Sequence, residues 1–111
     1  MNYLAHLYFS DPEPLAWAGS LMGDFVKGAL DTNLPSQLKN HIRLHRRIDS
    51  YTCDSVPFQD SRRRINSRFR LGRSVMVDVF YDHLLATTWK NHHSIPLEEF
   101  SQEVYVGLNE V

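Results

Sequence analysis

Several side chains of the kinds that bind metal ions lie on faces of the chain that ought to be buried. These carboxylate and imidazole side chains are His6, Asp24, His45, Asp49, Asp78, Asp82 and His83. Burying such groups is costly unless each is hydrogen-bonded, paired with an opposite charge or bound to a metal. A single divalent cation shared by several of them would satisfy all of them, so the pattern favours a metal centre that can do hydrolytic chemistry.

The spacing of these residues supports that interpretation. His45 and Asp49 are four residues apart, as are Asp78 and Asp82, so each pair shares one face of a helix. Each residue taken alone also has a purely structural explanation. A lone histidine such as His6, for example, is more often a hydrogen-bonded core residue. The coincidence of three segments that each present such groups is what favours the metal.

The ligand types restrict the metal. Cys53 is the only cysteine, which excludes a multi-cysteine zinc site and an internal disulfide. Imidazole with carboxylate suits manganese, iron, magnesium or zinc, and a carboxylate-rich set favours the harder ions. His41 precedes His45 by one helical turn, but it follows Lys39 and Asn40, so we expect it to be solvated.

Basic residues are concentrated in one part of the chain. Residues 43–73 carry nine arginines against three aspartates, whereas the remainder carries three lysines against ten acidic residues. Such a block points to a polyanionic partner, which nucleic acid, phosphate groups or an acidic protein would each satisfy. The alternative is a solvated face with local ion pairs.

The elements that must position these groups are all helical. Apolar residues recur at spacings of three and four, and strict period-two alternation is missing, so we expect one all-α domain over residues 1–111. The expected helices cover residues 2–9, 14–28, 33–52, 57–72, 73–91 and 96–108. Asn33 is the expected N-cap of the third helix.

The two ends of the chain lead to further expectations. The first ten residues lack a basic region and contain His6, so no signal peptide is expected, and no apolar run approaches the roughly 18 residues that span a membrane. With a single cysteine, a cytoplasmic setting is expected. The last helix is amphipathic and needs a partner, which suggests a C-terminally truncated domain or a homo-oligomer completed by another copy.

Four blocks resemble the signature segments of the acyl carrier protein phosphodiesterases. In order, these blocks are MNYLAHL, GSLMGDFVKG, IRLHRRIDSYT and VDVFYDHLLATTW. The resemblance covers residues 1 to about 90, and members of the family are similar to the HD-type metal-dependent phosphohydrolases. It implies an HD-like helical domain of about five to six helices. It also implies hydrolysis of the phosphodiester between 4′-phosphopantetheine and a serine of acyl carrier protein, with Mn²⁺ as the expected metal.

The resemblance also implies roles for individual residues. The metal ligands would come from His6, Asp24, Asp82 and His83, with the Asp82–His83 step as first choice, and His45 and Asp49 as further members. Asp49 or Asp78 would accept a proton from water, and His45, if it is not a ligand, would protonate the leaving serine. The phosphate and the acidic carrier protein would be bound by Arg46, Arg47, Lys27, Arg62, Arg63 and Arg64.

Three other functions compete with this one. A truncated, inactive relative would bind acyl carrier protein without turnover, and an HD-like phosphohydrolase would act on a nucleotide with the same arginines. A nucleic-acid-binding helical module would use the arginines without a metal, and the acidic and imidazole pattern counts against it. We therefore expect an acidic protein partner and neither nucleic acid nor membrane.

Overall fold

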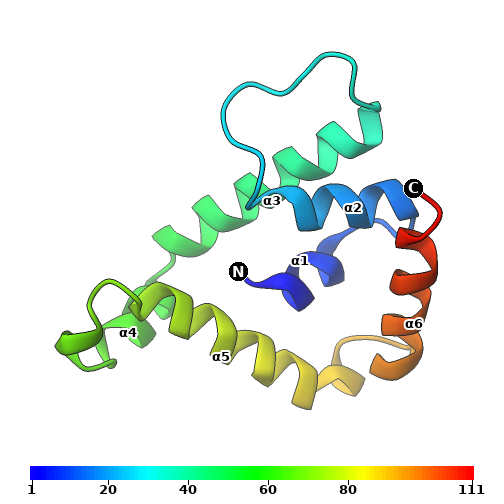
Figure 1. The fold of residues 1–111 in the computed structure, drawn as a ribbon. Coiled ribbons are helices and arrows are strands. Elements are labelled where there is room, and N and C mark those ends of the chain that lie inside the picture. Colours follow the sequence, from blue (N-terminus) through cyan, green and yellow to red (C-terminus); the bar gives the residue numbers. More distant parts are fainter.

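The protein is built from helices alone, as the periodicity predicts (Figure 1). The computed structural model describes residues 1–111 and contains no strand. The all-α prediction is therefore confirmed. The elements in chain order are α1 (Tyr3–Phe9), α2 (Pro14–Met22), α3 (Ser36–Asp54), α4 (Val56–Arg63), the 3₁₀ turn η1 (Ser67–Phe69), α5 (Arg73–Thr87), the 3₁₀ turn η2 (Trp89–Asn91) and α6 (Leu97–Leu108).

Helix α2 packs closely along α3, and this pair is the most extensive contact of the fold. The close approach depends on Gly19, because a Cβ atom at this position would lie 2.6 Å from the carbonyl oxygen of Leu38. Helix α1 contacts both α2 and α5, while α3 and α5 are joined through α4 (Figure 1). Helix α1 therefore lies between two arms that diverge from α4.

The main apolar cluster lies at the opposite end of the molecule from α4. It consists of Trp17, Trp89, Phe100 and Val104, which come from α2, η2 and α6. The Trp89 indole N–H donates to the carbonyl oxygen of Ile95 at 2.8 Å and holds the turn before α6. This cluster fixes α2 and α6 to each other. The N-terminal part of α5, which is remote from the cluster, instead contacts α1 and α4.

Two predicted helices are interrupted early, and the fifth ends at Thr87 rather than near residue 91. The second helix ends at Met22 and is followed by a turn over residues 23–25. A helix could not have continued to residue 28, because Gly28 adopts a positive φ of 72°. The expected helix over 57–72 breaks after Arg63, and the Asn66 side chain starts a new turn by accepting the Arg68 N–H. At Asn66, a polar side chain that bonds locally thus competes with the helix.

The third helix begins later than expected. Its N-cap is Pro35 rather than Asn33, and no side chain caps its first N–H groups. None of the helices is long and apolar enough to cross a membrane.

Candidate metal centre

His45 has a hydrogen-bond partner at each of its two ring nitrogens. Its Nδ1 lies 2.6 Å from the carbonyl oxygen of Ser20, which can only accept, so Nδ1 carries the proton and donates. The other nitrogen, Nε2, then faces two carboxylates, at 3.0 Å from Asp24 and 3.1 Å from Asp49. Helix α3 presents the ring, and Ser20 on α2 sets its orientation.

His6 approaches the same carboxylate from α1. Its Nε2 lies 3.0 Å from Oδ1 of Asp49, so the two oxygens of Asp49 face two different histidines. The rings of His6 and His45 stack on each other, and each side chain is only 1% exposed. The Nδ1 atom of His6 is buried without a hydrogen-bond partner. Both histidines are therefore withdrawn from water and directed at one acidic group.

The electrostatics of this cluster call for a positive charge. Burial opposes the charged form of Asp49, but hydrogen bonds from His45 and His6 outweigh it and hold the pKa of this carboxyl far below its usual value. Burial likewise opposes protonation of His45, but its contacts with Asp49, Ser20 and Asp24 raise its pKa above 6.5. Asp49 is therefore ionised, and a proton or a metal must stand at Nε2 of His45.

A cation already lies at the edge of the cluster. The Met1 ammonium donates to Oδ1 of Asp49 at 2.8 Å and lies 3.2 Å from Oδ1 of Asp78. Burial lowers the pKa of this amine, but the two carboxylates outweigh it and raise the pKa above its usual value. For Asp78, burial raises the pKa of the carboxyl. Asp78 thus belongs to the cluster through a shared cation.

The donor atoms of the cluster fit a divalent metal. One ligand atom each from His6, His45 and Asp49 can be chosen so that all lie within 4.8 Å of one another. Asp24 adds a fourth donor beside His45, and its side chain is 44% exposed, so one side of the cluster is open to solvent. Imidazole nitrogen with carboxylate oxygen suits manganese, iron or zinc. Nε2 of His45 faces the carboxylates of Asp24 and Asp49, and this is the structural reason for placing a cation there.

The predicted first-choice ligands, Asp82 and His83, are not brought into this cluster. The carboxylate of Asp82 accepts the backbone N–H groups of Leu4 and Ala5, at 2.8 and 3.0 Å, and so caps the first turn of α1. His83 lies on the exposed side of α5, with its ring near that of Phe80. Asp82 and Asp78 point toward α1, whereas His83, one position further, points away from it because of the helical rotation.

The basic residues predicted to bind the substrate lie in different parts of the structure. The Arg46 guanidinium donates to the carbonyl oxygen of Val26 at 3.1 Å and ties down the turn after α2. Arg47 is exposed and makes no such bond, and Lys27 is exposed in that turn. His41, expected to be solvated, is instead buried and pairs with Asp11 at 3.4 Å, because Gly19 lets α2 cover it. Arg62, Arg63 and Arg64 are exposed at the end of α4, where Arg63 pairs with Asp60.

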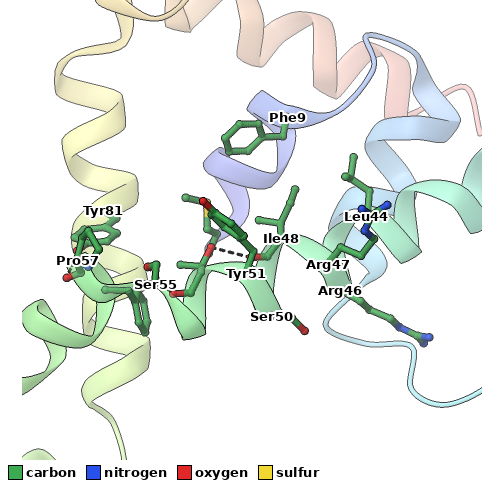
Figure 2. Close-up of a pocket in the computed structure, with 13 residues that line it drawn as sticks. Phe9, Leu44, Arg46, Arg47, Ile48, Ser50, Tyr51, Ser55, Pro57 and Tyr81 are labelled. Carbon is green, nitrogen blue, oxygen red and sulfur yellow. Dashed lines mark hydrogen bonds between the residues drawn. The ribbon is translucent and has the colours of Figure 1, made fainter.

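A cleft of about 800 Å³ runs along α3 beside the cluster (Figure 2). It begins near Met1 and Arg47 and extends past Tyr51 to Tyr81 and the first turn of α4. Phe9 of α1 faces it from the other side, while the Arg46 side chain points away toward the turn after α2 (Figure 2). The hydroxyls of Tyr81 and Ser61 lie 2.6 Å apart at the α4 end. None of His6, Asp24, His45 and Asp49 lines this cleft, and Met1, whose ammonium donates to Asp49, is the lining residue that connects it to the cluster.

Sequence reasoning missed two residues that shape the site. Ser20 contributes only its carbonyl oxygen, which no side-chain pattern reveals. A Cβ atom at Gly23 would lie 2.1 Å from Cγ of His45, so this position must be glycine for the ring to occupy its place. The signal available was the pair Gly19 and Gly23, four residues apart on the face that meets α3.

Comparisons with known proteins point to one family. A family model described as acyl carrier protein phosphodiesterase matches residues 1–111. An acyl carrier protein phosphodiesterase from Pectobacterium atrosepticum is 39% identical over 90 residues, which is 80% of this chain and 46% of the relative. Proteins of the same name from Klebsiella pneumoniae and Escherichia coli K12 are each 33% identical over 101 residues, 90% of this chain and 52% of each relative. The chain spans about half the length of these curated relatives. No solved structure matches it, so the likeness to HD-type phosphohydrolases stays a prediction.

Proposed function

The chain belongs to the acyl carrier protein phosphodiesterase family, and from this we propose that it hydrolyses the phosphodiester between 4′-phosphopantetheine and a serine of holo-acyl carrier protein. The observation that carries the proposal is the convergence of His6, His45 and Asp49, next to Met1, which lines the cleft along α3. Two buried imidazoles directed at one ionised carboxylate form a donor set that can hold a metal ion for hydrolysis.

We assign the metal to His6, His45, Asp49 and Asp24, with Mn²⁺ as the expected ion. When bound, such an ion polarises a phosphoryl oxygen and makes a bound water more acidic. Nε2 of His45 is assigned to the metal rather than to protonation of the leaving serine, because Nδ1 is engaged by Ser20 and Nε2 faces two carboxylates. Asp82 is assigned to holding α1 in place.

Asp78 is a better proton acceptor than Asp49 for the attacking water. Contacts with two histidines hold the pKa of Asp49 far below its usual value, which makes that carboxylate a weak base. Burial instead raises the pKa of Asp78, and a raised pKa brings a carboxylate closer to the range useful for general base catalysis. Asp78 also lines a second, smaller pocket of about 220 Å³, which it shares with Met1.

Two groups of basic residues are assigned to the substrate. Arg47, which is exposed at the cleft, would donate to the phosphate, whereas Arg46 positions the turn that carries Asp24. Arg62, Arg63 and Arg64 lie at the C-terminal end of α4, and the first turn of this helix lines the cleft. Acyl carrier proteins are strongly acidic, so these arginines would guide the protein substrate while the prosthetic group enters the cleft.

The proposal is tested by incubating the purified chain with holo-acyl carrier protein and Mn²⁺ and following release of phosphopantetheine by mass spectrometry. The expected result is apo-acyl carrier protein, with release abolished by a chelator and restored by Mn²⁺. Binding of holo-acyl carrier protein without release would instead identify a binding-only relative. Turnover of a nucleotide panel without action on holo-acyl carrier protein would identify a nucleotide phosphohydrolase.

A further inference from the structure

The loop between α4 and α5, residues 64–72, projects from the end of the molecule at which these two helices meet (Figure 1). Residues 61–73, which include this loop, contain six arginines and no acidic residue. Of these arginines only Arg63 forms an ion pair, with Asp60. The positive charge of the α4–α5 loop is therefore not neutralised within the chain, which indicates an anionic partner.

Local hydrogen bonds hold the backbone of the α4–α5 loop. The Arg70 N–H donates to the carbonyl oxygen of Ser67 at 3.1 Å. The Gly72 N–H donates to the carbonyl oxygen of Phe69 at 2.8 Å. Between these turns the Leu71 side chain is 96% exposed. Because the loop is already held in one shape, presenting this leucine to a partner costs little conformational entropy.

A hollow of about 390 Å³ lies beside Leu71. Its lining combines the apolar side chains of Phe69 and Met76 with Arg68 and Arg70. The guanidinium of Arg68 lies 4.7 Å from the centre of the Phe69 ring, and a guanidinium placed there keeps N–H groups free to donate. Apolar surface next to arginine is typical of the anchor points of protein interfaces. The loop therefore fits a protein that carries both carboxylates and apolar side chains.

The α4–α5 loop also lies close to the proposed hydrolytic centre. Arg73 begins α5, and Asp78, which contacts the Met1 ammonium, follows on the same helix about 8 Å along its axis. An interface that buries about 800 Å² of each partner is roughly 30 Å across. In holo-acyl carrier protein the phosphodiester is attached directly to a serine of the carrier. A carrier whose phosphodiester reaches the cluster therefore has its own surface within reach of the loop.

We propose that the α4–α5 loop is the docking site for the body of the acyl carrier protein. Leu71 packs against apolar side chains of the carrier, and Arg68 and Arg70 pair with its carboxylates. The inference rests on the proposed function and deepens it, because it names the contacts that hold the carrier. The arginines at the end of α4 attract the acidic carrier over a longer range, whereas the loop is in direct contact with it.

The test uses apo-acyl carrier protein, which lacks the prosthetic group, and a chelator, so that neither the cleft nor a metal contributes to binding. Isothermal titration measures its affinity for the chain. The double substitution Arg68→Glu and Arg70→Glu, and separately Leu71→Ser, should each lower the affinity at least about tenfold. Both variants should unfold in urea like the parent, because all three side chains are exposed.

Matched controls separate direct contact from general effects. Lys39→Glu with Lys90→Glu makes the same change in net charge, and Val106→Ser removes an exposed apolar side chain of α6. Both controls should bind apo-acyl carrier protein nearly as the parent does. Loop variants that bind like the parent would overturn the docking site, as would absence of binding by the parent up to about 1 mM.

Photo-cross-linking locates the contact. In a Cys53→Ser background, a benzophenone attached at Leu71→Cys should cross-link to apo-acyl carrier protein, whereas the same label at Val106→Cys should not. Equal cross-linking from both positions, or none from Leu71→Cys, would overturn the docking site. Vesicles of phosphatidylglycerol and phosphatidylcholine and a DNA duplex test the other polyanions. Binding to either one that Arg68→Glu with Arg70→Glu abolishes, without binding to apo-acyl carrier protein, would assign the loop to that partner instead.

The docking site and the proposed hydrolysis can fail separately. Affinity for apo-acyl carrier protein that depends on the loop, without release of phosphopantetheine from the holo form, would support the docking site and contradict the hydrolysis. Release of phosphopantetheine with a KM for holo-acyl carrier protein that the loop variants leave unchanged would support the hydrolysis and overturn the docking site.

Discussion

The imidazole rings of His6 and His45 stack with their centroids 3.5 Å apart and their planes within 9° of parallel. One ring comes from the shortest α-helix of the fold and the other from the longest, and each Nε2 faces a different oxygen of Asp49. The site therefore depends on how firmly α1 is held against α3. Removing either ring leaves the other beside a buried carboxylate.

His6→Ala and His45→Ala should each lower the affinity for Mn²⁺ by about 100-fold or more, because each removes a proposed ligand. Isothermal titration with Mn²⁺ measures the change. His41→Ala is the matched control, since His41 is also buried on α3 but pairs with Asp11 outside the cluster. The control should lose stability and keep its Mn²⁺ affinity. Equal affinity in all three variants would contradict the ligand assignment.

Gly23→Ala should displace the His45 ring, because the added methyl group would lie 2.1 Å from Cγ of that ring. Overpacking of this kind costs about 1–3 kcal/mol of stability, and Mn²⁺ affinity should fall with it. Gly107→Ala provides the comparison, since its methyl group would press on Trp17 at the other end of the molecule. That variant should lose stability, measured by urea unfolding, while its folded fraction binds Mn²⁺ normally.

Asp82→Ala should destabilise the fold by about 1–3 kcal/mol, because it leaves the N–H groups of Leu4 and Ala5 without their acceptor. Asp82→Asn keeps one acceptor oxygen and should recover part of this loss. If Asp82 were a ligand instead, both variants would lose Mn²⁺ affinity, because both remove the negative charge, and their free energies of unfolding would be unchanged. Urea unfolding and Mn²⁺ titration of both variants separate the two roles.

The metal-free chain should lose stability as the pH rises above neutrality. The pKa of His45 is raised in the folded state, so its contribution is present below 6.5 and is lost as the pH passes through the raised value. The pKa of Asp49 is lowered, so its contribution is present above 3.8 and is lost only on further acidification. Unfolding in urea at pH about 5 and about 8 should show this difference, and His45→Gln should reduce it. Mn²⁺ should bind more tightly at the higher pH, because it competes with the proton on Nε2.

The double substitution Arg63→Glu and Arg64→Glu should weaken binding of holo-acyl carrier protein and reduce its dependence on salt, because electrostatic attraction to the acidic partner is reversed. Mn²⁺ affinity should be unchanged, since both arginines are exposed at the end of α4. Lys39→Glu with Lys90→Glu makes the same change in net charge elsewhere and should affect binding much less. Equal effects of the two double variants would show that only net charge matters.

The sequence alone determined the helical class and part of the site. Apolar residues at spacings of three and four specify helices whatever their partners, and the four-residue step from His45 to Asp49 is a local property of one helix. These two residues accordingly lie together in the structure. Breaks such as the one at Asn66 were missed because they depend on a side chain that bonds to its own backbone.

Only the tertiary structure decided which of the remaining residues meet. Asp78, Asp82 and His83 belong to one helix, yet they have three different surroundings. Asp78 contacts the Met1 ammonium beside the cluster, Asp82 caps α1, and His83 faces outward. The periodicity of α5 could not separate them, because the helix is apolar on both sides and its pattern does not mark an inner face. Spacing shows which residues share a face of a helix, but the element that packs against that face is chosen by the rest of the chain.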